Sequence, residues 1–162
     1  MEIWGAAVIA GWLGSQLMAS TGILGANTTL GIITLWFIGA LVPVIASYFW
    51  IQNNDFEWIL LVWALAGVTG ILLNYASALG HLTLNPTLIY GRFWFAIAGV
   101  GFLATVYYVE GWSRKLYGAA AILNGIVALV FQAPQLQTYY FALAAAIQGG
   151  PMIIHGRRGT RL

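Results

Sequence analysis

The sequence has very few charged residues. Only 6% of its 162 residues are Asp, Glu, Lys or Arg, whereas about 25% is usual in soluble domains. Hydrophobic residues make up 61%, and the mean hydropathy is +0.86. A soluble fold of this size would need far more charge to cover its surface. We therefore expect one domain, residues 1–162, whose surface lies mostly in lipid.

Several chemistries are excluded by residues that are missing. There is no cysteine, which rules out disulfides, thiolate nucleophiles and cysteine-held metal or iron–sulfur sites. There is also no Walker loop, HExxH or GxSxG motif, and no His, Asp and Glu cluster with metal-ligand spacing. The six Lys or Arg, three of them close to the C-terminus, are too few for a nucleic-acid surface. We expect no enzyme, no metal, no cofactor and no nucleic-acid partner.

Hydropathy divides the chain into six apolar segments, each close to the length of about 20 residues that a membrane span needs. This predicts an all-α integral membrane protein, a compact six-helix transmembrane bundle with short loops. A five-span arrangement, with the last two segments merged or one of them re-entrant, stays open. The predicted spans are residues 3–20, 30–51, 57–79, 93–109, 116–131 and 136–154, followed by a short basic cytoplasmic tail, residues 155–162.

The distribution of Lys and Arg predicts the orientation of these spans, because cytoplasmic loops carry an excess of positive residues. With six spans and a cytoplasmic N-terminus, Arg92 alone lies outside. The inside residues are Arg114, Lys115, Arg157, Arg158 and Arg161. Both termini are therefore expected inside, in a multi-pass protein of the cytoplasmic (inner) or cell membrane.

Two apolar segments resemble each other at an offset of 90 residues. WGAAVIAGWLG at 4–14 aligns with WFAIAGVGFLA at 94–104. The identical pairs are Trp4/Trp94, Ala6/Ala96, Gly11/Gly101 and Leu13/Leu103. Two halves of three spans each would have inverted topologies, as in many secondary transporters. A 3+3 inverted repeat is one interpretation, and chance similarity between apolar helices is the other.

Six polar residues are candidates for a ligand site. An unpaired amide is costly in hydrocarbon, so each amide within a span must meet a partner, water or a ligand. Such amides can join helices, or they can line a pocket for an uncharged ligand. Most of the polar residues lie toward the outer side, which predicts a pocket that opens outward. The candidate ligand-binding residues are Gln16, Asn74, His81, Asn85, Arg92 and Asn124.

Small residues share one face in three of the predicted helices. Such faces let helix backbones approach closely, which predicts packing within the bundle and leaves open docking to other membrane subunits. The residues are Ala7, Gly11 and Gly14 in the first span, Ala121, Gly125 and Ala128 in the fifth, and Thr138, Ala142, Ala145 and Gly149 in the sixth.

Charge is missing from the interior of every predicted span, which disfavours proton-driven transport. His81 and His155 are predicted on opposite sides of the membrane, about 30 Å apart, so one haem held by both is not expected. The segment 80–95 is predicted to be the outer loop between the third and fourth spans. Its Asn85-Pro86 pair favours a turn.

These features lead to three functional hypotheses. The first is a transporter, or the membrane-embedded substrate-binding subunit of one, for a neutral or lipophilic small molecule held in an outward-facing pocket. In size and number of spans alone, the chain resembles the vitamin-binding subunits of energy-coupling-factor transporters, whose small-residue docking face Ala6 and Ala10 would suit. The alternative is a structural or anchoring subunit of a larger membrane complex, beside haem, quinone, carotenoid or lipid. An intramembrane enzyme acting on lipid or isoprenoid substrates is the third.

Overall fold

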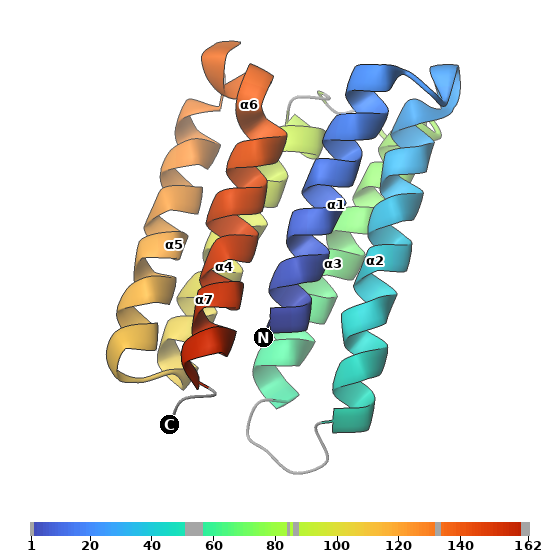
Figure 1. The fold of residues 1–162 in the computed structure, drawn as a ribbon. Helices are drawn as coiled ribbons and strands as arrows, with labels where there is room; N and C mark the ends of the chain where they lie inside the picture. Colours follow the sequence, from blue (N-terminus) through green and yellow to red (C-terminus); the bar gives the residue numbers. More distant parts are fainter. Residues whose placement is uncertain (1, 51–56, 84, 86–87, 132–133, 160–162) are drawn as a thin grey trace.

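The computed structural model shows a bundle of six long helical segments (Figure 1). It describes residues 2–50, 57–83, 85, 88–131 and 134–159, without the side chains at 42–44, 46–50, 57–58, 60–61, 134–138 and 159. Every regular element in these residues is a helix. The all-α prediction and the number of helices are therefore confirmed.

The helices run alternately up and down the bundle, and both termini lie at its lower end (Figure 1). The first three are α1 (Glu2–Thr21), α2 (Thr28–Trp50), which follows the short turn η1 (Gly25–Asn27), and α3 (Glu57–Ala78). The π-helical η2 (Leu88–Arg92) leads into α4 (Phe93–Tyr108), and α5 (Gly111–Val130) comes next. The last segment is continuous and consists of α6 (Pro134–Ala144), the π-helical η3 (Ala145–Gly149) and α7 (Gly150–Gly159).

Three helix ends extend beyond the predicted spans. The fourth helical segment begins at Leu88 of η2, so residues 88–95 of the predicted outer loop 80–95 are helical. α5 begins at Gly111, well before residue 116, and α7 continues to Gly159 through much of the predicted tail. Hydropathy ends a span where charged residues begin, but backbone hydrogen bonding in a helix continues past that point. Gly111, the first residue of α5, makes the tight turn into this helix with a φ of +55°, which glycine adopts without strain.

The six segments form a closed ring. Each helix packs against its neighbours in sequence, and the last segment contacts both α5 and α1. α1 and η3 approach so closely that a Cβ added to Gly5 would lie 2.8 Å from the carbonyl oxygen of Gly149. A Cβ added to Gly99 of α4 would lie 3.5 Å from the Cβ of Asn124 on α5. Gly5 therefore sets the spacing of α1 and η3, whereas the α4–α5 contact at Gly99 is ordinary van der Waals packing that would admit a Cβ.

The small-residue faces mostly contact other helices of the same chain. A Cβ on Gly11 would meet the ring of Trp36 at 3.0 Å, and one on Gly14 would meet Leu35 at 2.9 Å. Gly149 faces Ile9. Thr138, the first residue of the last face, is among the side chains outside the description. These contacts are packing within the bundle, whereas Ala6 and Ala10 are exposed on α1.

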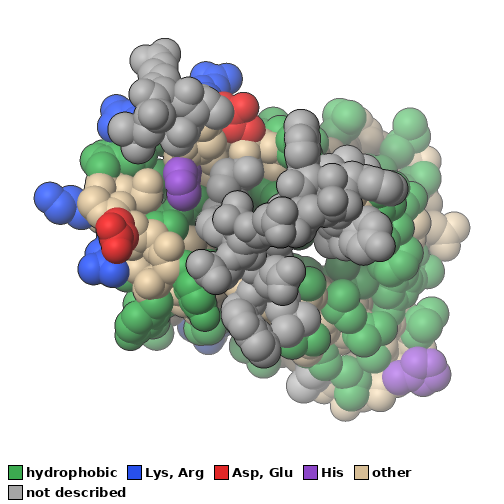
Figure 2. All heavy atoms as spheres, turned by 90° about the horizontal axis from the view of Figure 1, so that it is seen from below, with side chains coloured by type: hydrophobic (Ala, Val, Ile, Leu, Met, Phe, Trp, Pro, Cys, Tyr) green, Lys and Arg blue, Asp and Glu red, His purple; other side chains and the backbone are tan. Residues whose placement is uncertain are grey.

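The described surface is largely hydrophobic, while polar side chains lie in the interior. Five aliphatic side chains are at least 63% exposed: Leu17, Ile23, Val100, Ile122 and Leu129. The buried polar residues are Ser15, Asn74, Thr105, Asn124 and Gln148. Seen from below, charged side chains gather on one part of the lower end, and hydrophobic ones cover much of the rest of the described surface (Figure 2). Contiguous exposed apolar surface of this kind marks contact with a membrane or a partner.

Two helical stretches in the described residues are long and apolar enough to cross a membrane, Glu2–Thr21 and Leu88–Tyr108. Gly25–Leu41 and Val62–Ala78 are apolar but shorter. A buried core helix or a signal sequence meets the same criterion. By length and composition, two candidate spans are supported, against the six predicted.

Candidate functional site

Two cavities lie within the bundle, one toward each end. The upper cavity has a volume of about 340 Å³ and lies toward the end away from the termini. The lower cavity has a volume of about 100 Å³ and lies toward the end that carries the termini. Helices α1, α2, α3 and α4 contribute to the lower cavity, together with Gln148 of η3 and Met152 of α7. The same four helices line the upper cavity. There η2 adds Tyr90, and α6 adds Tyr140 and Phe141.

Asn74, a residue of the upper cavity wall, carries a buried polar atom without a partner among the described residues. Asn74 of α3 lines this cavity and is 6% exposed. Its Oδ1 is buried and has no hydrogen-bond partner among the described residues. A buried acceptor left unpaired costs about 1–3 kcal/mol, so a donor beyond the described residues would stabilise this oxygen. Thr28 and Thr29 add hydroxyl groups to the same wall, and Thr29 is exposed, which brings the cavity to the surface.

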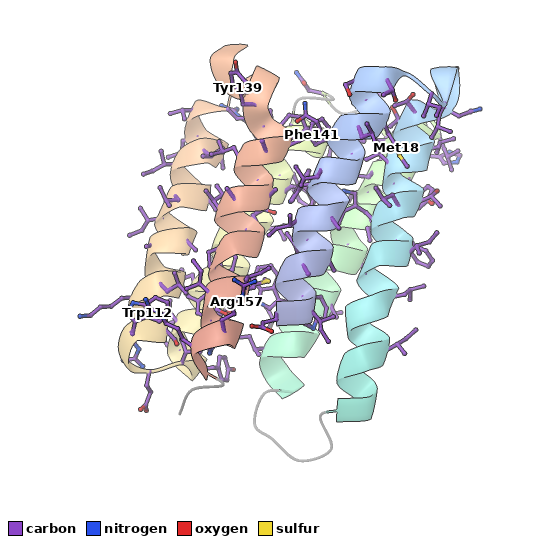
Figure 3. All side chains as sticks on the ribbon, in the orientation of Figure 1. Met18, Trp112, Tyr139, Phe141 and Arg157 are labelled. Carbon is purple, nitrogen blue, oxygen red and sulfur yellow. The ribbon has the colours of Figure 1, made fainter. Side chains whose placement is uncertain are left out.

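Three tryptophans separate the two cavities. Trp12, Trp36 and Trp94 line both of them. The rings of Trp12 and Trp36 meet edge to face, with their centroids 4.7 Å apart. The rings of Trp36 and Trp94 are stacked, with their centroids 6.0 Å apart. We call these three residues the tryptophan cluster. Phe141, which lies between α6 and α1 (Figure 3), contacts Trp12 from the upper side.

A glycine and a hydroxyl group on α1 hold Trp36 in this cluster. The indole Nε1–H of Trp36 donates to Ser15 Oγ over 3.1 Å. Ser15 in turn donates to the carbonyl oxygen of Gly11, over 2.7 Å and within the same helix. The Trp36 ring fills the space that Gly11 leaves by having no side chain. The ring is therefore fixed by packing and by a hydrogen bond.

The same contact recurs between α3 and α4. Trp63 Nε1–H donates to Thr105 Oγ1 over 3.2 Å, and Thr105 donates to the carbonyl oxygen of Gly101 over 2.8 Å. The Trp63 ring packs against Gly101, where an added Cβ would meet it at 2.7 Å. Gly101 and Thr105 lie 90 positions after Gly11 and Ser15. The sequence similarity thus coincides with a repeated structural contact.

The lower cavity lies between these two matching helix pairs. Its walls include Trp4, Ala7 and Val8 of α1 and, at the same offset of 90, Trp94, Ile97 and Ala98 of α4. If the chain consisted of two duplicated halves of three helices each, the residue equivalent to Trp36 would lie 90 positions later, at 126 on α5. That residue is Ile126, which is 50% exposed. In the matching contacts, α1 therefore corresponds to α4 and α2 corresponds to α3. The two helices of each corresponding pair run in opposite directions (Figure 1).

A chain of amides fixes the remaining side of the lower cavity. Trp12 Nε1–H donates to Gln148 Oε1 over 2.9 Å, and Gln148 Nε2–H donates to Asn124 Oδ1 over 3.1 Å. Asn124 Nδ2–H donates to the carbonyl oxygen of Ala120 over 2.9 Å. Gln148 is in the π-helical η3, a distortion of helices that is frequent at functional sites. Both ends of the Gln148 amide are therefore engaged by protein.

Among the six predicted ligand-binding residues, only Asn74 lines either cavity. Gln16 is half-buried on α1 and lies outside both cavity walls. His81 is exposed after α3, and its backbone N–H donates to Ala76 over 2.8 Å. Asn85 is exposed, and its backbone carbonyl accepts the N–H of Leu88 over 3.0 Å.

Arg92 and Asn124 hold helices together. Arg92 Nη2–H donates to the carbonyl oxygen of Leu129 over 3.1 Å, near the C-terminal end of α5, where a positive charge is favourable. Its Nε is buried without a partner among the described residues. Asn124 is fully buried between α5 and η3 with its amide satisfied on both sides. The structure does not bring these two residues together with Asn74.

The histidines lie at opposite ends of the bundle. His155 of α7 lies 2.8 Å from the hydroxyl oxygen of Tyr117, measured from Nδ1, at the end that carries the termini. His81 follows α3 at the other end. Within the described ranges, His, Asp and Glu form no group of three that could hold a metal ion.

The tryptophans are the wall residues that the sequence reasoning missed, and Gln148, an amide within a predicted span, was not among its six candidates. Trp12, Trp36 and Trp63 lie well inside the predicted spans, whereas tryptophans that anchor a helix in a membrane lie at its ends. A buried indole N–H needs an acceptor, so a tryptophan in the middle of a span indicates a polar partner on another helix. That signal is present in the sequence, but it does not identify the partner.

Comparisons with protein-family models, curated proteins and solved structures return no significant match. The similarity to energy-coupling-factor subunits therefore stays one of size and number of helices.

Proposed function

We propose that the chain is a six-span membrane protein, with both termini inside, that binds a neutral or lipophilic small molecule in the upper cavity. It acts as a transporter or as the membrane-embedded binding subunit of one. The exposed aliphatic side chains and the buried amides support a lipid environment, because this distribution is the reverse of that in soluble domains.

The unpaired Oδ1 of Asn74 is the single observation that carries the binding proposal. Asn74 is a wall residue of a cavity of about 340 Å³, a volume within the usual range of small-molecule sites, and a small side-chain movement would turn Oδ1 toward a ligand there. An acceptor at that position selects a ligand with a hydroxyl or N–H group. The tryptophan cluster and Phe141 supply flat apolar surface for the rest of the molecule.

In the proposed orientation this cavity faces outward. Arg114, Lys115 and Arg158 belong to the lower end, with the termini. The positive-inside rule places that end in the cytoplasm. The upper cavity is then open to the outer side, where Thr29 reaches the surface.

Native mass spectrometry of the protein, extracted in a mild detergent, tests the proposal. We expect a neutral small molecule with a hydroxyl or N–H group to remain bound. Asn74→Leu should remove it, because the substitution deletes the acceptor and leaves the cavity walls otherwise intact. Retention of the same molecule by Asn74→Leu, or recovery of the protein with stoichiometric foreign subunits and no ligand, would count against a ligand-binding role.

Tyr75→Phe is the matched control. Tyr75 is adjacent to Asn74 on α3, but its hydroxyl oxygen lies 3.0 Å from Thr34 Oγ1, and the residue is not part of the upper cavity. This variant also loses one polar group at the same height in the bundle. It should keep the ligand, so loss in both variants would indicate general disruption of α3.

A further inference from the structure

The lower cavity has a chemical character of its own. Five tryptophans contribute to its walls: Trp4, Trp12, Trp36, Trp63 and Trp94. Gln148 is the one amide side chain in these walls, and both of its ends are bound to protein, by Trp12 and by Asn124. The indole N–H groups of Trp36 and Trp63 are also engaged, by Ser15 and Thr105. A polar ligand group would find few free partners there.

Glycines on two facing helices keep this space open. Gly39 of α2 and Gly67 of α3 line the cavity, and a Cβ added to either would meet no atom of the described residues within 4 Å. The volume of about 100 Å³ is of the same order as the apolar cavity of about 150 Å³ that binds benzene or xenon in an engineered protein. One ring, or a branched hydrocarbon unit of similar size, fits these dimensions.

Charge also limits what can occupy the cavity. The wall residues that the structure describes include no carboxylate to balance a cation, although tryptophan faces do attract cations. A buried cation without a counter-charge is strongly disfavoured. The occupant is therefore uncharged as well as apolar.

We propose that the lower cavity is a second binding site, for an uncharged apolar group of about the size of a benzene ring. The tryptophan cluster separates this cavity from the upper one, so its occupant is a molecule distinct from the ligand proposed at Asn74.

Iodobenzene is the probe for this site, because its iodine can be located in crystals by anomalous scattering and also quenches tryptophan fluorescence. We expect an iodine peak between Trp63 and Gly67 and saturable quenching in solution. Gly67→Leu fills the cavity and should abolish the peak and weaken the saturable quenching by about tenfold or more. A peak confined to the upper cavity or to the lipid-facing surface would overturn the proposal, as would unchanged quenching in Gly67→Leu.

Gly118→Leu is the matched control for Gly67→Leu. Gly118 is a helical glycine of α5, a Cβ there also meets nothing within 4 Å, and the residue lines neither cavity. This variant should keep both the peak and the quenching. Asn74→Leu should also keep them, since iodobenzene needs no acceptor. Iodobenzene bound in the lower cavity without any co-purifying ligand would refute the proposed function alone, whereas a co-purifying ligand with an empty lower cavity would refute the second site alone.

Discussion

The indole N–H of Trp12 donates to the side-chain carbonyl of Gln148 over 2.9 Å, across 136 positions of sequence. This contact joins α1 to the last helical segment and so closes the ring of helices. The other end of the same amide donates to Asn124 on α5. One buried glutamine therefore links three helices and sets the position of a tryptophan shared by both cavities.

Gln148→Leu should destabilise the protein, because it leaves the Trp12 N–H and the Asn124 carbonyl without partners. We expect a loss of about 1–3 kcal/mol in the free energy of unfolding. Denaturant unfolding in detergent micelles measures it. Gln16→Leu removes a half-buried amide from α1 and should change stability by less than about 0.5 kcal/mol. Equal losses in the two variants would show that the amide chain has no special role.

Ser15→Ala and Thr105→Val should have similar effects, since each removes the acceptor of one tryptophan N–H. Each should cost about 0.6–1.7 kcal/mol, as measured for hydrogen bonds between membrane helices. The two contacts share no residue, so the double variant should show the sum to within about 0.5 kcal/mol. A large effect at only one position would mean that the two helix pairs are not equivalent.

Gly149→Ala should be harmful, while Gly150→Ala should not. A Cβ at Gly149 would lie 2.8 Å from the carbonyl oxygen of Gly5 and would also meet Ile9, so α1 and η3 would have to separate. Overpacking of this kind costs about 1–3 kcal/mol. A Cβ at Gly150 meets nothing within 4 Å, and alanine there should stabilise the helix by up to about 1 kcal/mol. Melting temperatures of the two variants in detergent compare them directly.

The absence of cysteine makes the wild-type chain a ready background for topology mapping. His81→Cys, in the exposed residue after α3, should react with a membrane-impermeant maleimide added outside intact cells. Lys115→Cys, exposed near the start of α5, should react only after the membrane is permeabilised. The opposite pattern would invert the orientation, and reaction of both in intact cells would contradict the predicted span 93–109, which lies between them.

Hydropathy was sufficient to predict six helices, because each needs an apolar stretch of similar length. It located the core of each helix but not every end. Arg114 and Lys115 lie just before the start of the predicted fifth span, yet both belong to α5. In α7, Arg157 and Arg158 are likewise helical. Helical hydrogen bonding continues into water, whereas a hydropathy window stops where charge begins.

The partners of the buried polar residues could not be predicted from the sequence. Asn74 and Asn124 looked alike as amides within apolar helices, but the rotation of each helix gives them different surroundings. Asn124 faces Gln148, and Asn74 faces a cavity. The similarity at an offset of 90 residues was visible in the sequence. The repeated contact was not, because it involves Trp36 and Trp63, which lie outside the aligned segments.

A structure of the protein purified from its own membrane without delipidation tests the binding role of the upper cavity most directly. We predict density for a small molecule in that cavity, with a donor atom about 2.7–3.2 Å from Asn74 Oδ1 and an apolar portion that contacts Trp36 and Trp94. Ordered water alone at Asn74, or an Asn74 side chain paired with another residue of the protein in a collapsed cavity, would contradict it.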